Sequence, residues 1–231
     1  AILAARQSLR QHLADSGEAH WEDLYRAMKL DGPYEPEASA IGRRSLAITV
    51  LGYLAKTRSV DEILTERFNK ASNLTERFAA YRIARSDGSV ELSERLSRNF
   101  LAEAETDEVL DLWLSTEAMN ESTATVDRLH ELLLHERFTW TNPNRVRAVL
   151  GTFANRNVRA FHTPEGYRLL ADAVLKLDAM NPQIASRLVM PLCQWARFTE
   201  QYQASMKVEL RRVMAKDLSK DLYEIVSKSV D

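Results

Sequence analysis

The 231-residue chain is 45% hydrophobic and 28% charged, with 31 basic and 33 acidic residues and a net charge of −2. This length and apolar content suffice for one large core or a row of small ones, so we expect a folded, soluble protein. The balanced charge excludes an overall attraction to nucleic acid or acidic lipid, and no apolar run is long enough to span a membrane.

The single cysteine and the first residues of the chain bear on where the protein is located and on whether it belongs to a longer polypeptide. Cys193 excludes an internal disulfide and lies in an apolar run, which is typical of a reduced core thiol. The N-terminus lacks the charged-then-apolar form of a signal peptide, so we predict a cytoplasmic protein. The chain begins at Ala1, without Met and inside an amphipathic segment, and we therefore expect a piece of a longer polypeptide.

The periodicity of apolar residues predicts an all-α fold. Only 7 Gly and 6 Pro are present, and no stretch sustains the alternation of apolar and polar residues that marks a strand. About thirteen helices are expected, at 1–16, 18–30, 37–57, 60–71, 73–85, 90–104, 107–119, 123–135, from 143, from 164, from 182, at 199–215 and at 219–229. Short connections favour antiparallel helix pairs in one domain, 1–231, either an α-solenoid or a compact array.

Several local signals set the expected helix boundaries. Gly17 should end the first helix, and the apolar residues on more than one side of 37–57 predict a central helix between neighbours. Ser59 with Glu62 has the spacing of a capping box, and Asn73 with Glu76 should open the next helix.

An Asn-Pro helix start occurs twice in the second half of the chain. Asn142-Pro143 and Asn181-Pro182 each offer a capping oxygen followed by a residue that lacks an N–H, so helices should begin at both prolines. The two copies lie 39 residues apart. This interval is close to the period of HEAT-like repeats, about 40 residues, and favours stacked helix pairs.

Each of these helix starts carries an amide side chain and an arginine at helical spacing. Asn144 precedes Arg147 by three residues and Gln183 precedes Arg187 by four, so each pair should share one helix face. Such a place suits an anion. The alternative, favoured on spacing alone, is that the arginines cover neighbouring carboxylates or helix ends.

The segment from His130 to His135 superficially resembles a zinc-protease motif but should not bind metal. The H-E-x-x-H motif places two histidines four residues apart, whereas these are five apart and so about 140° apart around a helix. No other spacing of His, Cys, Asp and Glu matches a metal site, and no phosphate-binding glycine loop or nucleophile motif is present. We predict no catalytic residue and no metal ligand in this chain.

A family resemblance is concentrated after His130. The chain reads FTWTNPNRVR from Phe138 and NPQIASRL from Asn181, and it ends with LSKDLYE from Leu218. In this order, these segments resemble the C-terminal domain of bacterial-type aminopeptidase N, in the alanyl aminopeptidase family of zinc metallopeptidases.

The resemblance implies a HEAT/armadillo-like superhelix that packs over an upstream catalytic domain and encloses its cavity. It implies zinc in the parent enzyme but none in this fragment, which lacks the family's H-E-x-x-H and G-x-M-E-N motifs. It also implies peptide substrates, with Arg147, Arg187 and Gln183 lining the cavity near the bound peptide.

Two alternatives remain open at this point. A free-standing HEAT-like scaffold would bind a protein partner on its concave face. Nucleic-acid binding would need a basic stripe that the composition does not supply.

Overall fold

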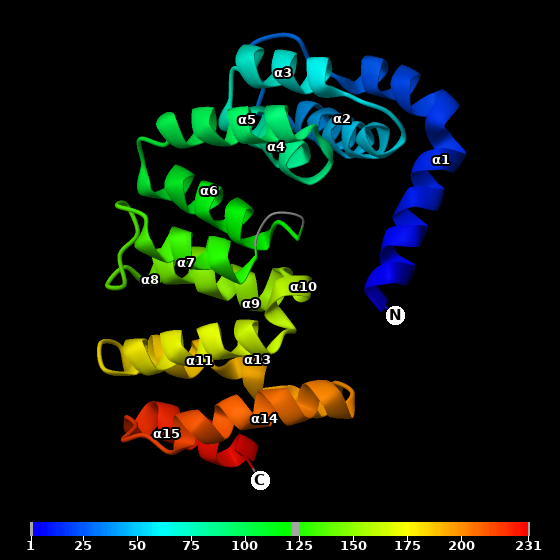
Figure 1. Cartoon of the computed structure of the whole chain (residues 1–231). Coiled ribbons are helices and arrows are strands. Elements are labelled where there is room, and N and C mark those ends of the chain that lie inside the picture. The colour runs from blue at the N-terminus through cyan, green and yellow to red at the C-terminus, as the bar shows by residue number, and fades with distance from the viewer. Residues whose placement is uncertain (1, 122–124, 231) are drawn as a thin grey trace. The chain divides into compact units, whose positions relative to one another are not determined.

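The computed structural model describes residues 2–121 and 125–230, and every regular element within these ranges is helical (Figure 1). The all-α prediction is therefore confirmed. The chain divides into two compact units, Ala1–Ala104 and Glu105–Asp231. That the whole of 1–231 acts as one domain stays a prediction.

The first unit contains five helices. They are α1 (Ile2–Met28), α2 (Ala38–Thr57), α3 (Asp61–Lys70), α4 (Leu74–Asp87) and α5 (Val90–Ala102). The predicted central helix corresponds to α2, which packs against both α1 and α4 and buries Val50, Leu51 and Leu54. Its Ile41 and Leu46 side chains are instead exposed, so its apolar surface is narrower than the sequence suggested.

The prediction that Gly17 ends a helix is wrong, because α1 continues through it. A Cβ at position 17 would overlap the indole ring of Trp21, one turn further along the helix. The absent side chain thus gives Trp21 room to turn back and donate a hydrogen bond from Nε1 to the carbonyl of Ala14, at 2.9 Å. The Trp21 ring also stacks on Tyr53, with 5.3 Å between ring centroids.

Of the two capping predictions in this unit, one is confirmed and one is wrong. Asn73 Oδ1 accepts from the Glu76 N–H at 3.0 Å, and Asn73 Nδ2 donates to Glu76 Oε2 at 2.7 Å. Ser59 does not cap α3, because the first intrahelical bond runs from the Leu64 N–H to the Val60 carbonyl and places Val60 at the N-cap.

The second unit is built from more numerous and shorter elements. They are α6 (Asp107–Met119), α7 (Val126–Leu134), α8 (Pro143–Val146), the π-helix η1 (Arg147–Gly151), α9 (Thr152–Arg156), α10 (Val158–Phe161), α11 (Pro164–Asp178), α12 (Pro182–Leu188), α13 (Met190–Cys193), the 3₁₀-helix η2 (Trp195–Arg197), α14 (Glu200–Met214) and α15 (Lys220–Val230). The predicted start at Thr123 lies outside the described residues.

The core of the second unit is organised around α11. This helix buries eight of its 15 residues, including Tyr167, Leu170, Val174 and Leu177, and it packs against α12 and α14. Side chains cap some of the helices around it: α15 has a hydroxyl cap, as the sequence predicted, whereas Thr199 at the start of α14 makes no side-chain capping bond. At the start of α15, Ser219 Oγ accepts from the Leu222 N–H at 3.2 Å. The segment after Pro143 and the segment after Pro182 are each divided into several short elements, which sequence periodicity did not indicate.

Candidate functional site

The first Asn-Pro start forms the predicted helix cap. Asn142 Oδ1 accepts from the Asn144 N–H at 2.9 Å and from the Arg145 N–H at 3.4 Å, and Pro143 occupies the first turn. The capping oxygen therefore satisfies two of the main-chain donors that the start of a helix leaves without partners.

Arg147 is exposed and is held beside Asn144. Its Nη2 donates to Asn144 Oδ1 at 2.7 Å and its Nε donates to the Pro143 carbonyl at 3.1 Å. The three-residue spacing thus brings the amide and the guanidinium together, as predicted. A guanidinium has five N–H donors, so these two bonds leave others without an acceptor among the described residues.

A π-helical turn begins at Arg147. The Arg147 carbonyl accepts from the main-chain N–H of Thr152, five residues on, and α-helical bonding resumes with α9. Isolated π-turns of this kind occur often at functional sites. No sequence signal pointed to this turn, because its apolar residues, Val149 and Leu150, also fit the spacing of an α-helix.

Arg145, two residues before Arg147, has the opposite role. It is 3% exposed, and it donates to Asp111 Oδ1 at 2.6 Å and to Asp107 Oδ1 at 2.7 Å, both on α6. Burial raises the pKa of Asp111, and the adjacent Arg145 charge opposes that shift. Sequence analysis did not single out Arg145. It fixes the first helix start to α6 and leaves Arg147 on the outside.

The second Asn-Pro start is also capped by its asparagine, but here the arginine has no partner among the described residues. Asn181 Oδ1 accepts from the Ile184 N–H at 3.2 Å, and Pro182 again lies in the first turn. Gln183 and Arg187 are both exposed. Across 2–121 and 125–230, neither side chain has a hydrogen bond or an ion pair, so the four-residue spacing does not link them.

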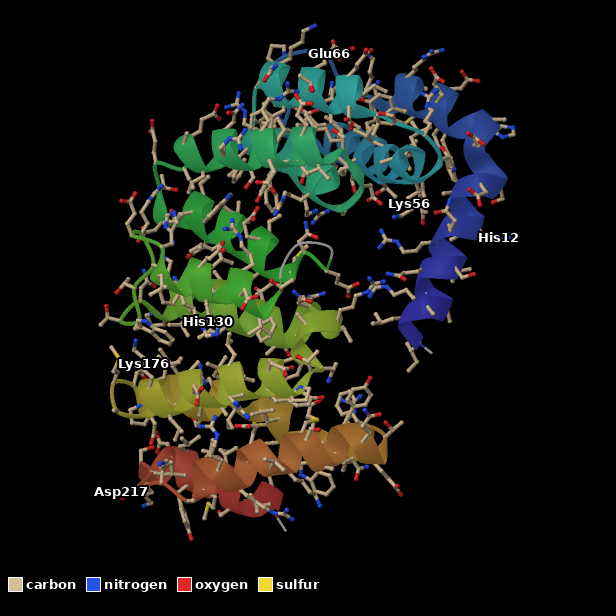
Figure 2. All side chains as sticks on the ribbon, viewed as in Figure 1. His12, Lys56, Glu66, His130, Lys176 and Asp217 are labelled. Carbon is tan, nitrogen blue, oxygen red and sulfur yellow. The ribbon has the colours of Figure 1, made fainter. Side chains whose placement is uncertain are left out.

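The two histidines of the rejected zinc motif lie in different surroundings. His130 is exposed on α7 (Figure 2), whereas His135 follows the end of that helix with its ring centroid 5.3 Å from that of Trp113. Burial lowers the pKa of His135. In the described part of the chain, no group of three His, Cys, Asp or Glu side chains could hold a metal ion.

Trp140, just before the first helix start, is half-buried between two other side chains. The Lys176 ammonium of α11, labelled in Figure 2, lies 4.1 Å from the Trp140 ring centroid, and Phe138 packs edge-on at 5.3 Å. These contacts attach the loop before Asn142 to α11.

Comparisons with known proteins give concordant matches over the chain. Residues 1–231 match the family described as a domain of unknown function, DUF3458_C, with ARM repeats, which supports the predicted HEAT/armadillo-like repeat class. The chain is 32% identical to aminopeptidase N of Haemophilus influenzae over 99% of its own length, and 34% identical to aminopeptidase N of Caulobacter vibrioides over 100%. It spans only 27% of the length of each of these two relatives.

A solved structure supports the same fold. The crystal structure of Legionella pneumophila aminopeptidase A in complex with aspartic acid matches with a TM-score of 0.86 and 26% sequence identity, over 98% of this chain and 28% of that one.

None of the described helices is both long and apolar enough to cross a membrane.

Proposed function

Because the chain belongs to the DUF3458_C family of ARM-repeat domains, whose relatives here are aminopeptidases, we propose that it is the C-terminal, cavity-enclosing domain of a zinc-dependent aminopeptidase. One observation carries the proposal. The aminopeptidase N relatives match from end to end of the chain, yet the chain spans only 27% of their length, which leaves room for a catalytic domain elsewhere in the parent protein.

In this proposal the chain contributes no metal ligand. Zinc in proteins takes three or four His, Cys, Asp or Glu ligands, and the described residues bring no three of these together. The donors of this chain therefore do not fit the metal, and the zinc belongs to the catalytic domain of the parent. Peptide hydrolysis would occur there, and the helical domain would act on the substrate by contact.

The residues proposed to contact the peptide are Arg147, Arg187 and Gln183. All three are exposed and follow an Asn-Pro cap by a few residues, and both arginines retain hydrogen-bond donors that no described protein group uses. Guanidinium groups bind carboxylates and carbonyl oxygens, so they suit the part of a peptide beyond the residue being removed. A hydrogen bond to a charged group contributes about 1.5–3 kcal/mol, so each arginine could change peptide affinity about tenfold.

The free-standing scaffold considered above loses support, because each relative named here contains the matching region within a much longer chain. We also propose a cytoplasmic location, with which the single free cysteine, Cys193, is compatible.

Metal content and activity of two chains test the proposal. The full-length parent should contain about one zinc per chain, as expected of a catalytic zinc site, and should hydrolyse aminoacyl anilides. The 231-residue chain alone, dialysed and assayed identically, should do neither. Stoichiometric zinc or anilide hydrolysis in the isolated chain would contradict it, as would a full-length parent without aminopeptidase activity.

A further inference from the structure

The hydrogen bond between Asn144 and Arg147 is the last of a series of contacts that begins at the first helix cap. Asn142 Oδ1 accepts from the Asn144 N–H at 2.9 Å, which fixes the main chain of Asn144. Asn144 Oδ1 in turn accepts from Arg147 Nη2 at 2.7 Å, and the Pro143 carbonyl accepts from Arg147 Nε at 3.1 Å. The Arg147 side chain is exposed, yet two of its three nitrogen atoms are bonded to the protein.

The main chain of this segment is anchored on both sides of Asn144 and Arg147. Arg145 is buried and donates to two aspartates of α6. The Arg147 carbonyl accepts from the Thr152 N–H and, at 3.4 Å, from the Thr152 hydroxyl. The fold therefore sets the position of the Arg147 main chain, and the bond to Asn144 restricts the side-chain torsions that remain.

Arg187 at the second start provides a contrast within the same chain. It follows Gln183 by four residues, but no hydrogen bond or ion pair links these two side chains or joins either of them to another described residue. A long arginine side chain loses much rotamer freedom when it is fixed in one orientation. A ligand of Arg187 has to impose that order on binding, whereas Asn144 already imposes part of it on Arg147.

We propose that Asn144 is a positioning residue, which orders the Arg147 guanidinium before the peptide binds and so raises the affinity for peptides. This role rests on the proposed function, in which Arg147 contacts the part of the peptide beyond the residue being removed. The two bonds to the protein use two of the five N–H donors of the guanidinium, so three remain for the peptide. Binding to a side chain that is already ordered costs less conformational entropy.

A double-mutant cycle in the full-length parent enzyme, with KM and kcat measured for tri- and tetrapeptides, tests this role. Asn144→Ala should raise KM about threefold, within the range expected for ordering one flexible side chain, and kcat should change little. In the Arg147→Ala background, Asn144→Ala should have no further effect, because no guanidinium is left to orient. A residue that only maintained the fold would instead lower the turnover of peptides and of single-residue anilides in both backgrounds.

Two controls accompany this cycle. Gln194→Ala removes the amide of another exposed pair, in which Gln194 Oε1 accepts from Arg197 Nη1 at 3.0 Å, and it should leave KM unchanged because the pair belongs to neither Asn-Pro start. The same cycle at the second start, with Gln183→Ala and Arg187→Ala, should give additive effects, because no bond couples these two side chains in the described ranges.

The possible results separate the role of Asn144 from the proposed function. A raised peptide KM in Arg147→Ala, together with a wild-type KM in Asn144→Ala, would overturn the positioning role and leave the proposed function standing. An undiminished effect of Asn144→Ala in the Arg147→Ala background would also overturn it, as would coupling of equal size at the second start. A wild-type peptide KM in Arg147→Ala would contradict the proposed contact itself, and the positioning role with it.

Discussion

The two Asn-Pro helix starts share a sequence pattern and an asparagine side-chain cap, but they present their arginines differently. At the first, Arg147 is bonded to Asn144 and to the Pro143 carbonyl, and a π-turn begins at the same residue. At the second, Arg187 emerges from α12 with no hydrogen bond or ion pair to any described residue.

This difference shows that the cap determines where each helix begins but does not determine how the arginine is oriented. Asparagine and proline determine where each helix begins, because one supplies an acceptor and the other lacks a donor that would need one. The direction of the arginine depends on the spacing to the amide and on the turn that follows. The first start therefore holds its arginine in one orientation, whereas the second leaves rotamer freedom that a ligand would have to restrict.

The largest expected effect is at Arg145, which is buried, whereas Arg147, two residues later, is exposed. Arg145→Met should lower the free energy of unfolding by about 3 kcal/mol, the lower end of the range for breaking a buried ion pair, because Asp107 is largely exposed and Asp111 partly so. Arg147→Met should change the free energy of unfolding by no more than about 0.5 kcal/mol. Urea denaturation of the 231-residue chain measures both. Equal losses would mean that the exposed arginine also stabilises the fold.

The two caps should have smaller and comparable effects. Asn142→Ala and Asn181→Ala should each cost about 1 kcal/mol of unfolding free energy, with the larger loss at Asn142, whose oxygen accepts two N–H groups. Asn→Ser at each position should restore most of the stability, since serine is as good a cap. If Asn181→Ala is neutral and Asn142→Ala is not, the two starts are unequal in structure as well as in arginine presentation.

His162, which lies between the two helix starts in the sequence, should have a weaker effect on stability that depends on pH. Its Nδ1 lies 2.8 Å from the Tyr167 hydroxyl, and rings of Phe161, Phe198 and Tyr202 surround it. Burial lowers the pKa of His162 below its ordinary value of 6.5. The unfolded chain therefore binds more protons than the folded chain between the two pKa values, and stability rises with pH across that window.

On acidification from pH 7, the stability of the second unit should begin to fall near pH 6.5 and level off below the folded pKa of His162. His162→Gln should reduce this slope. Some of the slope should remain in this variant, because burial also lowers the pKa of His135. His12→Gln, at an exposed position of α1 (Figure 2), is the matched control. Thermal midpoints between pH 5 and 8 provide the measurement, and an unchanged slope in His162→Gln would refute the assignment.

The sequence predicted many of the features that depend on neighbouring residues, although Ser59 does not cap α3 and, among the described residues, Gln183 is not hydrogen-bonded to Arg187. The caps at Asn73, Asn142 and Asn181, the all-α class and the Asn144–Arg147 pair all follow from spacing along one helix. Gly17 was misread because its role is to admit the Trp21 indole, a side-chain packing effect that turn statistics do not include.

Features that depend on distant residues could not be predicted in this way. The partners of Arg145 lie 34 and 38 residues away on α6, and nothing in the spacing distinguishes Arg145 from Arg147.

The central claim is that Arg147 and Arg187 bind the peptide and do not stabilise the fold. A kinetic comparison in the full-length parent enzyme tests this most directly. Arg147→Ala and Arg187→Ala should each raise KM for tri- and tetrapeptides about tenfold, while kcat and the hydrolysis of single-residue anilides stay nearly unchanged, the pattern of lost uniform binding. Arg211→Ala, at an exposed arginine of α14 that belongs to neither helix start, should leave both substrate classes unaffected. Equal losses on peptides and anilides would contradict the account and would mean that the arginines maintain the position or the fold of the domain.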